Sequence, residues 1–388
     1  MGHGSRRQGR AGSIVSTNGR PRGPHVAYIG STSRSGSTVL ELLLAGLPGF
    51  VAVGELRHLW QRGVVGNQLC GCGLPFHECP FWTEVGQRAF GGWDADDGRE
   101  VVALQRRVDR FRHLPLQAAP GLWPPFRRRL DAYAERTARV YKAVAEVSGA
   151  EVVVDSSKAP GFAAMIDRIP GVRVHLIHLV RDSRGVAYSW QRRVDRPETG
   201  TRGPDMPTYG PARVALEWVL WNTVFELLGL RMGRTRVHYE ALIEHPSGEL
   251  RRIAQAAGDA QPTADDSASR AEADVGTHHT VSGNRVRFHK GPLDLRVDDE
   301  WKAAMPLRDR TIVTLMTWPL LLAYRGLGRA AVQVATKARE QQYAARPAGS
   351  RTGLGPREPA RTQRRESRPP GHPARTAVSS GDGQPHRR

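Results

Sequence analysis

The sequence has no apolar segment long enough to cross a lipid bilayer, and its first residues lack the apolar stretch of a secretory signal. A membrane-spanning helix needs roughly 20 mostly apolar residues. The run TIVTLMTWPLLLAY (311–324) is shorter and contains Pro319, so we expect a core helix that breaks at the proline. Residues 1–24 are basic but have no apolar core of the signal-peptide kind. The sequence therefore predicts a cytoplasmic protein.

Lysine is scarce, with five residues against 52 arginines in a chain of 388 residues and net charge +19. Much of this charge lies at the two ends, because residues 1–24 carry +5 and residues 337–388 carry +8. Both segments are rich in Arg, Gly, Pro and Ser, and they bury too little apolar surface to offset chain entropy. We expect disordered basic tails at 1–24 and 331–388 around a folded domain at 25–330.

Basic tails can contact nucleic acid, anionic lipid or a protein partner. Because arginine is used throughout the chain, we favour solvated tails with at most weak contact to anionic surfaces and no specific nucleic-acid partner. The alternative is a non-catalytic protein that binds nucleic acid or a membrane through its tails. Its binding would depend steeply on salt and would survive deletion of residues 25–330.

Cysteine is also rare, and all three cysteines lie in CGCGLPFHECPFW (70–82). Cys70, Cys72 and Cys79 offer four zinc ligands together with His77, although not at the spacing of a standard zinc finger. The alternatives are one disulfide with a free thiol, or three reduced cysteines in a Gly-rich insertion at about residues 60–98. A reducing cytosol argues against a stable disulfide. We expect a structural role without a metal and keep the metal site as an alternative.

Strand-like and helix-like segments alternate along the chain, which predicts an α/β fold with a central parallel sheet and helices on both faces. The expected strands are His25–Ile29, Phe50–Val53, Glu151–Val154, Val172–Val180 and Arg236–Tyr239. The expected helices are Thr38–Leu47, about 126–147, Pro160–Ile169, Arg184–Val194, Pro211–Met232 and Ala241–Ala257.

The first strand leads into a loop that is typical of phosphate binding, in VAYIGSTSRSGSTVLELLLAGL (26–47). Backbone N–H groups of Ser35, Gly36, Ser37 and Thr38 would point at an anion from a helix N-terminus. An ATP-binding loop has Lys directly after its last glycine, but here Ser37 stands there and the only cation is Arg34. The loop therefore indicates a phosphate ligand other than the triphosphate of ATP.

A second basic site follows the strand in VHLIHLVRDSRGVAYSW (174–190). Arg181 follows the strand, at the edge of the sheet where ligands of open α/β folds bind. Ser189 and Arg193 lie four residues apart on one helix face. Two anion pockets at neighbouring strand ends favour a nucleotide that carries phosphate at both ends of its ribose.

The motifs RSGST, VDSSK, RDSRGVAYS, VHYEAL and HTVSGNRVRFHKG, in this order, resemble those of sulfotransferases that use 3′-phosphoadenosine 5′-phosphosulfate (PAPS). The spacing from Arg181 to Ser189 is similar to that family's 3′-phosphate pattern, whereas Arg285 stands where bacterial relatives have Pro. The resemblance covers most of residues 25–330. It implies a P-loop NTPase-like three-layer fold, PAPS as donor, no required metal, and a small-molecule, glycan or lipid acceptor with a hydroxyl or amine.

The same resemblance implies roles for single residues. Glu55, which follows Gly54 and a short strand, is the expected base, and His58 is its local competitor. Arg34 would hold the 5′-phosphate and Lys158 the sulfuryl group. The remaining residues expected at the nucleotide are Arg181, Ser189 and Arg193 at the 3′-phosphate, Tyr239 along the pocket wall, and Arg287 and Lys290 in a late loop that closes over the 3′-phosphate. The competing enzyme class is a P-loop small-molecule kinase, against which the missing lysine and the second arginine pocket speak.

Overall fold

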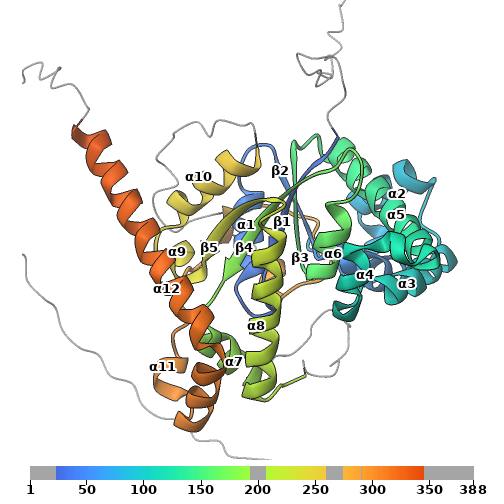
Figure 1. Cartoon of the computed structure of the whole chain (residues 1–388). Helices are drawn as coiled ribbons and strands as arrows, with labels where there is room; N and C mark the ends of the chain where they lie inside the picture. The colour runs from blue at the N-terminus through green and yellow to red at the C-terminus, as the bar shows by residue number, and fades with distance from the viewer. Residues whose placement is uncertain (1–22, 193–206, 259–273, 290, 345–388) are drawn as a thin grey trace, which may run out of the picture. The chain divides into compact units, whose positions relative to one another are not determined.

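The computed structural model describes residues 23–192, 207–258, 274–289 and 291–344 (Figure 1). The chain divides into two units, Met1–Val332 and Gln333–Arg388, and the first holds the sheet and the helices around it. Arg193 and Lys290 lie outside the described residues, as do positions 1–22 and 345–388 of the expected tails.

Five parallel strands form the central sheet, in the order β2-β3-β1-β4-β5. Their bounds are β1 His25–Gly30, β2 Phe50–Gly54, β3 Val152–Lys158, β4 Arg173–Val180 and β5 Gly233–His238. β1 lies in the middle, where Ala27 pairs with Val154 of β3 on one side and with His175 of β4 on the other. Because all pairs are parallel, the carboxyl ends of the five strands meet at one edge of the sheet.

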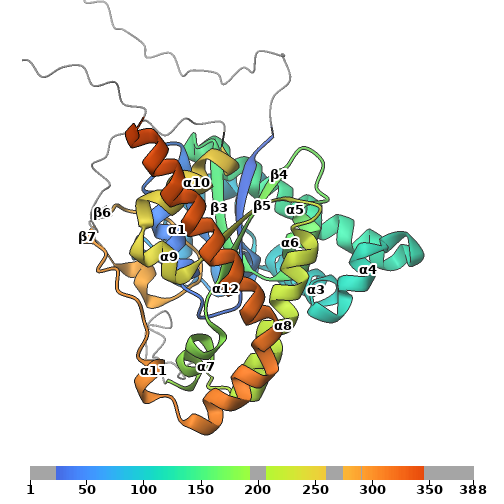
Figure 2. The same ribbon diagram turned by 60° about the vertical axis from the view of Figure 1, so that its left-hand side comes forward.

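Alternating side chains of β1 pack on opposite faces of the sheet, as a strand buried on both sides requires. Val26 and Tyr28 belong to one core cluster, and Ala27 and Ile29 belong to the other. The first face is covered by α5 (Pro124–Ser148), α6 (Pro160–Ile166) and α8 (Pro211–Leu228), and the second by α1 (Ser37–Ala45), α9 (Tyr239–Glu244) and α10 (Pro246–Ala257) (Figure 2). The three-layer α/β prediction is therefore confirmed.

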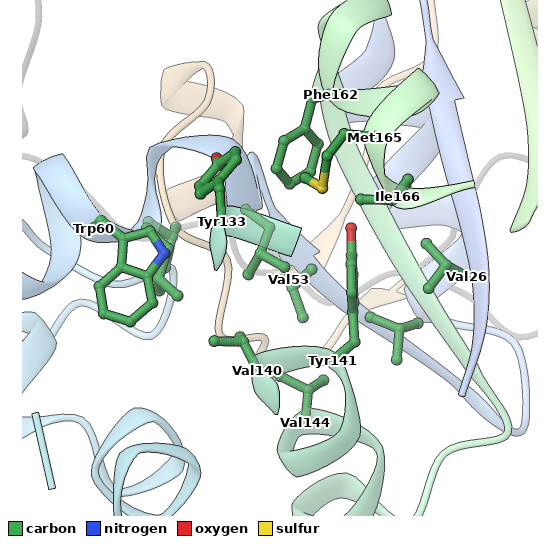
Figure 3. Packing of buried hydrophobic residues seen from close by; sticks show 14 of the residues in the cluster. Val26, Val53, Trp60, Tyr133, Val140, Tyr141, Val144, Phe162, Met165 and Ile166 are labelled. Carbon is green, nitrogen blue, oxygen red and sulfur yellow. The ribbon is translucent and has the colours of Figure 1, made fainter. Parts of the chain in front are cut away.

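The core between the sheet and α5 and α6 joins large aromatic and branched side chains (Figure 3). Tyr141 of α5 and Phe162 of α6 are buried there together with Val53 at the end of β2. Burying a side chain of this size contributes about 1.5–3 kcal/mol. Tyr141 also donates a hydrogen bond of 2.5 Å to Asp155, which satisfies its hydroxyl inside the core. This packing fixes β2 and β3, whose ends carry Glu55 and Lys158.

The segment expected as an insertion at 60–98 is mostly helical and joins the same core. It contains η2 (Leu59–Val64), η3 (Phe76–Glu78), α2 (Pro80–Phe90) and the start of α3 (Ala95–Val108). Trp60 makes edge-on ring contacts with Phe90 and Trp93, and Phe76 makes a tilted contact with Trp93. The ring centres of these pairs are 5.4–5.7 Å apart. The remaining short elements before α5 are η1 Leu56–His58, η4 Phe111–His113, α4 Leu114–Ala118 and η5 Pro120–Leu122.

The C-terminal elements are α7 Ser183–Gln191, β6 Asp274–Val275, η8 Arg285–Phe288, β7 Gly291–Pro292, α11 Trp301–Ala304 and α12 Leu307–Ala344. They differ from the sequence prediction in α12, which extends to Ala344 although residues 331–344 were expected in a disordered tail. The helix was also expected to break at Pro319, but α12 continues through it. Pro319 has no N–H for the carbonyl of Leu315, and the residue Leu315 as a whole is exposed, so this part of the helix faces solvent. Among the described helices, none is both long and apolar enough to cross a bilayer.

Candidate functional site

Five of the predicted site residues lie at the carboxyl ends of the five strands, one at each strand. Arg34 follows β1, Glu55 follows β2, Lys158 ends β3, Arg181 follows β4 and Tyr239 follows β5. In open α/β folds this edge of the sheet is where ligands bind. The structure thus brings together residues that are more than 200 positions apart in the sequence.

The loop after β1 is compact and leads into an uncapped helix. Ser35, Ser37 and Thr38 are buried, and Gly36 at the start of α1 has a φ of 88°. A Cβ on Gly36 would lie 2.5 Å from the ring of Tyr239, so only glycine fits here. Within α1 no side chain caps the first turn and no acid lies in it. The first N–H groups of α1 are therefore suited to receive an anion.

Arg181 connects this loop to a later segment of the chain. Its guanidinium donates to the backbone carbonyl of Arg34 at 3.0 Å and to the backbone carbonyl and carboxylate of Asp298 at 2.9 Å. The same group lies 4.6 Å from the ring centre of Tyr239. Arg181, expected in the second anion pocket, therefore contacts the loop expected to form the first, and an anion at Arg181 would compete with Asp298.

Helix α7 also contacts the loop after β1, through Trp190. The guanidinium of Arg34 lies 5.4 Å from the ring centre of Trp190, which is next to the half-buried Ser189. The sequence predicted Ser189 for this site but not Trp190. An aromatic residue directly after the expected phosphate ligand was the available signal.

Glu55 and Lys158 form an ion pair across the ends of β2 and β3. Glu55 Oε1 accepts from Lys158 Nζ at 2.5 Å, and Glu55 Oε2 accepts from the Ser282 hydroxyl at 3.1 Å. His58 Nε2 lies 3.5 Å from the same oxygen. Lys158 Nζ also donates to the carbonyl of Ser156 at 3.0 Å. Lys158 adopts a φ of 64°, a strained conformation for a residue with a Cβ and one that is common at functional sites.

The charges of this cluster follow from burial and from its neighbours. Burial alone would raise the pKa of Glu55, but Lys158, His58 and Arg62 outweigh it and lower the pKa to about 2. Burial lowers the pKa of His58 to about 3, although Glu55 opposes this shift. At neutral pH Glu55 is therefore an anion and His58 is neutral. Of the two candidate bases, only Glu55 faces a cation within direct hydrogen-bonding distance.

A second carboxyl group, that of Glu41, forms hydrogen bonds with residues close in sequence to Glu55 and Lys158. It is buried on α1 and accepts from the Gly54 backbone N–H at 2.6 Å and from the Ser156 hydroxyl at 2.8 Å. Burial raises the pKa of Glu41 to about 8, and both hydrogen bonds oppose the shift. Glu41 thus holds the residues that precede Glu55 and Lys158. The sequence signal that could have found it is an acid among the buried leucines of α1.

The late loop is the segment of the motif HTVSGNRVRFHKG, of which residues 279–289 are described, and it pairs with the end of β2. Val281 exchanges backbone hydrogen bonds with Val53 and Glu55, at 2.9 and 2.8 Å, which places Ser282 on Glu55. Arg287, expected at the 3′-phosphate, is fully buried and donates to the carbonyls of Thr280 and Leu69 at 2.9 Å each. In the described structure it fastens the late loop to the Cys-rich segment.

The Cys-rich segment contains a cluster with a different histidine from the one expected. The potential ligand atoms of Cys70, Cys72, Cys79 and His279 all lie within 4.8 Å of one another. His77 is not in this group, because its Nε2 lies 2.9 Å from the carbonyl of Val64. The three cysteines are free thiols. A donor set from two distant segments is thus present beside the site.

A cavity of about 670 Å³ lies apart from the strand ends. It is lined mainly by apolar residues, among them Val39 of α1, Leu69 next to Cys70, and Val286 and Phe288 of η8. None of the strand-end residues Arg34, Glu55, Lys158, Arg181 and Tyr239 lines it. We therefore do not assign this cavity to the chemistry at the strand ends.

Neither a comparison with protein-family models nor one with curated proteins gave a match. Among solved structures, the sulfotransferase domain of the Synechococcus PCC 7002 olefin synthase is similar, with 20% identity, a TM-score of 0.38, and coverage of 76% of this chain and 95% of that one. The sulfotransferase domain from the curacin biosynthetic pathway has 16% identity, a TM-score of 0.40, and coverage of 76% and 99%. Sulfotransferase STF9 from Mycobacterium avium has 14% identity, a TM-score of 0.36, and coverage of 64% and 67%.

Proposed function

We propose that this protein is a sulfotransferase that moves a sulfuryl group from PAPS to a hydroxyl or amine of a small-molecule, glycan or lipid acceptor. The observation that carries the proposal is the arrangement at the sheet edge. Glu55 after β2 is ion-paired with Lys158 at the end of β3, and β3 lies next to β1, which is followed by the loop that carries Arg34. The order of the sequence motifs that resemble PAPS-dependent enzymes supports it independently.

Donor binding uses the loop after β1 and the start of α7. The 5′-phosphosulfate takes the N–H groups at the start of α1 and the guanidinium of Arg34. The 3′-phosphate takes Arg181 and Ser189, and it displaces the Asp298 carboxylate that now pairs with Arg181. Tyr239, which contacts both Gly36 and Arg181, fixes the distance between the two anion positions. Arg287 is not included, because its guanidinium serves backbone carbonyls.

In the transfer step the acceptor oxygen attacks sulfur, and the bond from sulfur to the bridging phosphate oxygen breaks with its electron pair going to phosphate. Glu55 takes the proton of the attacking hydroxyl. Lys158 turns from Glu55 toward the sulfuryl and bridging oxygens, where negative charge develops. This movement also removes a cause of the low pKa of Glu55, so the carboxylate becomes a stronger base once the donor is bound.

Calorimetric titration of the full chain with adenosine 3′,5′-bisphosphate, beside ATP with Mg²⁺, tests this proposal. We expect the bisphosphate to bind at least about tenfold more tightly, because only it carries phosphate at both ends of the ribose. Preference for magnesium-ATP would overturn the proposal in favour of a kinase. Binding of neither would overturn the nucleotide site itself. After a positive result, labelled PAPS with small-molecule, glycan and lipid acceptors identifies the acceptor class.

A further inference from the structure

The cysteines and His279 enclose a space with the dimensions of a metal site. Cys79 Sγ lies 3.6 Å from Cys70 Sγ and 3.7 Å from Cys72 Sγ. His279 Nδ1 lies 3.2 Å from Cys79 Sγ and 3.8 Å from Cys70 Sγ. A disulfide would need about 2.05 Å between sulfurs. The four atoms therefore meet around a common point without any of them being bonded to another.

These separations agree with a tetrahedral zinc ion. With Zn–S bonds of about 2.3 Å and Zn–N bonds of about 2.0–2.1 Å, tetrahedral geometry places two sulfurs about 3.8 Å apart, and a sulfur and a nitrogen about 3.5 Å apart. The two S–S distances are shorter than this value by one to two tenths of an ångström, and the two S–N distances lie about 0.3 Å below and above theirs. The remaining two pairs of ligand atoms also lie within 4.8 Å of each other. Three thiols and one imidazole are also a ligand set that zinc uses at structural sites.

The backbone around the cysteines is folded to present them. Cys70 donates its N–H to the carbonyl of Leu74 and accepts from Gly73, each at 2.8 Å, which closes a tight turn between the first two cysteines. Gly71 fits between this turn and the late loop, because a Cβ there would lie 2.5 Å from the side chains of His278 and Thr280. The turn thus depends on glycine at the place where the two segments meet.

The imidazole of His279 is held in position by two neighbours of Cys79. Phe81 stacks on the His279 ring at 4.8 Å between ring centres with an angle of 9°. Trp82 donates its indole N–H to the His279 carbonyl at 2.9 Å. Supporting contacts of this kind orient a metal ligand before the metal binds. The donor atoms are therefore arranged by the surrounding fold and not by a chance approach of one side chain.

We propose that Cys70, Cys72, Cys79 and His279 bind one structural Zn²⁺ ion, which joins the Cys-rich segment to the late loop. Four protein ligands leave no open position for a substrate, so the ion stabilises the fold and takes no part in chemistry. Arg287 donates to the carbonyls of Leu69 and Thr280, each next to a ligand, and its positive charge offsets the excess of three thiolates over the ion. The proposal does not depend on the sulfotransferase activity.

The zinc ion would also position the site at the strand ends. His279 is three residues before Ser282, which donates to Glu55, and between them Val281 pairs with β2. Loss of the ion would leave the late loop held to the Cys-rich segment only by hydrogen bonds such as those of Arg287 and Trp82, and would weaken the hydrogen bond to Glu55. The ion would thus help to position Glu55 indirectly, through Val281 and Ser282.

Metal analysis of the purified full-length chain tests the proposal, with His279→Ala and His77→Ala compared. His77→Ala is the matched control, because His77 lies in the same Cys-rich segment but outside the cluster. We expect about one zinc per chain in the wild type and in His77→Ala, and about tenfold less retained by His279→Ala after dialysis against a mild chelator. Equal zinc in both variants, or loss in His77→Ala alone, would overturn the ligand set.

A second measurement covers the case in which His279→Ala does not fold. The wild-type chain is stripped of metal and titrated with Co²⁺, which gives visible absorption bands typical of tetrahedral thiolate coordination. We expect these bands with one equivalent and their loss when Zn²⁺ displaces cobalt. A folded chain that binds neither ion, or an intact mass that shows a Cys–Cys disulfide in the protein as purified, would refute the zinc site.

Discussion

Glu55 faces the ammonium group of Lys158, the hydroxyl of Ser282 and the imidazole of His58. Kinetics of a Glu55 variant can distinguish a catalytic base from a carboxylate that only supports the fold. If Glu55 takes the proton of the attacking substrate hydroxyl, Glu55→Gln should lower kcat by roughly 10²-fold or more. The amide can still form hydrogen bonds, but it takes no proton. Affinity for adenosine 3′,5′-bisphosphate should change little. Steady-state kinetics and calorimetry on the same preparation give both values. Full turnover in Glu55→Gln would transfer the role of base to His58, which His58→Ala then tests.

Asp298 and a phosphate compete for the same guanidinium in the proposed site. Asp298→Asn should therefore tighten adenosine 3′,5′-bisphosphate binding by about three- to tenfold, since it removes a negative charge from Arg181. Arg181→Ala should do the opposite and weaken binding more than it lowers kcat at saturating donor. Arg192→Ala is the control, because Arg192 is an exposed arginine at the end of α7 that pairs with Glu300. Weaker binding in Asp298→Asn would mean that Asp298 orients Arg181 and does not block it.

At the scale of elements, the contact between β2 and the late loop depends on Gly54. Gly54 has a φ of 81°, and a Cβ there would lie 2.3 Å from the Val281 carbonyl oxygen. A strained backbone conformation alone costs roughly 1–3 kcal/mol, so Gly54→Ala, which adds a collision, should lower the free energy of unfolding by more than this. It should also lower kcat, because Ser282 would move away from Glu55. Thermal unfolding and turnover are the measurements.

Gly91 provides the matched control for this comparison. It ends α2 with a φ of 78°, and nothing lies within 4 Å of a Cβ built on it. Gly91→Ala should therefore show the backbone strain without the collision and should keep normal kcat. Equal effects of the two substitutions on stability and turnover would argue that the contact between β2 and the late loop is unimportant.

The elements that the sequence predicted best are those with local signals. The continuous apolar run of β1, and the Gly-Ser turn before α1, are visible within a few residues. Pro319 was expected to break its helix for an equally local reason, yet α12 continues through it, on a part of the helix where Leu315 is exposed to solvent. A local rule for one residue therefore does not decide where an element ends when solvent can reach the backbone.

At the scale of the whole molecule, the contacts that complete the site join segments far apart in the sequence. Glu55 and Lys158 were expected at the site from the motifs that resemble PAPS-dependent sulfotransferases, and the structure places both at carboxyl ends of neighbouring parallel strands. The contacts of His279 and Ser282 could not be predicted, because no spacing rule connects residue 70 or 55 with a loop more than 200 residues later. His77 was nearer in sequence to the cysteines, but its ring is directed at Val64.

Two carboxyl groups near the site, the partly buried Glu55 and the buried Glu41, make opposite contributions to the pH dependence of stability. Glu55 has its pKa lowered to about 2 by folding, so its contribution is present above about pH 4.5 and is lost as the pH falls toward 2. Glu41 has its pKa raised to about 8, so the folded chain binds a proton that the unfolded chain has released. Its contribution is present below about pH 4.5 and is lost as the pH rises toward 8.

Replacing Glu41 should therefore flatten the pH dependence on the neutral side alone. In wild type, the free energy of unfolding should fall between about pH 5 and 8 through Glu41, by on the order of a few kcal/mol, because one pKa unit corresponds to about 1.4 kcal/mol. Glu41→Gln keeps a hydrogen-bonding group beside Gly54 and Ser156 but cannot titrate, so much of this fall should disappear. Urea unfolding at several pH values measures it. An unchanged slope in Glu41→Gln would mean that the hydrogen bonds from Gly54 and Ser156 keep Glu41 ionised inside the core, as a fixed negative charge beneath Lys158.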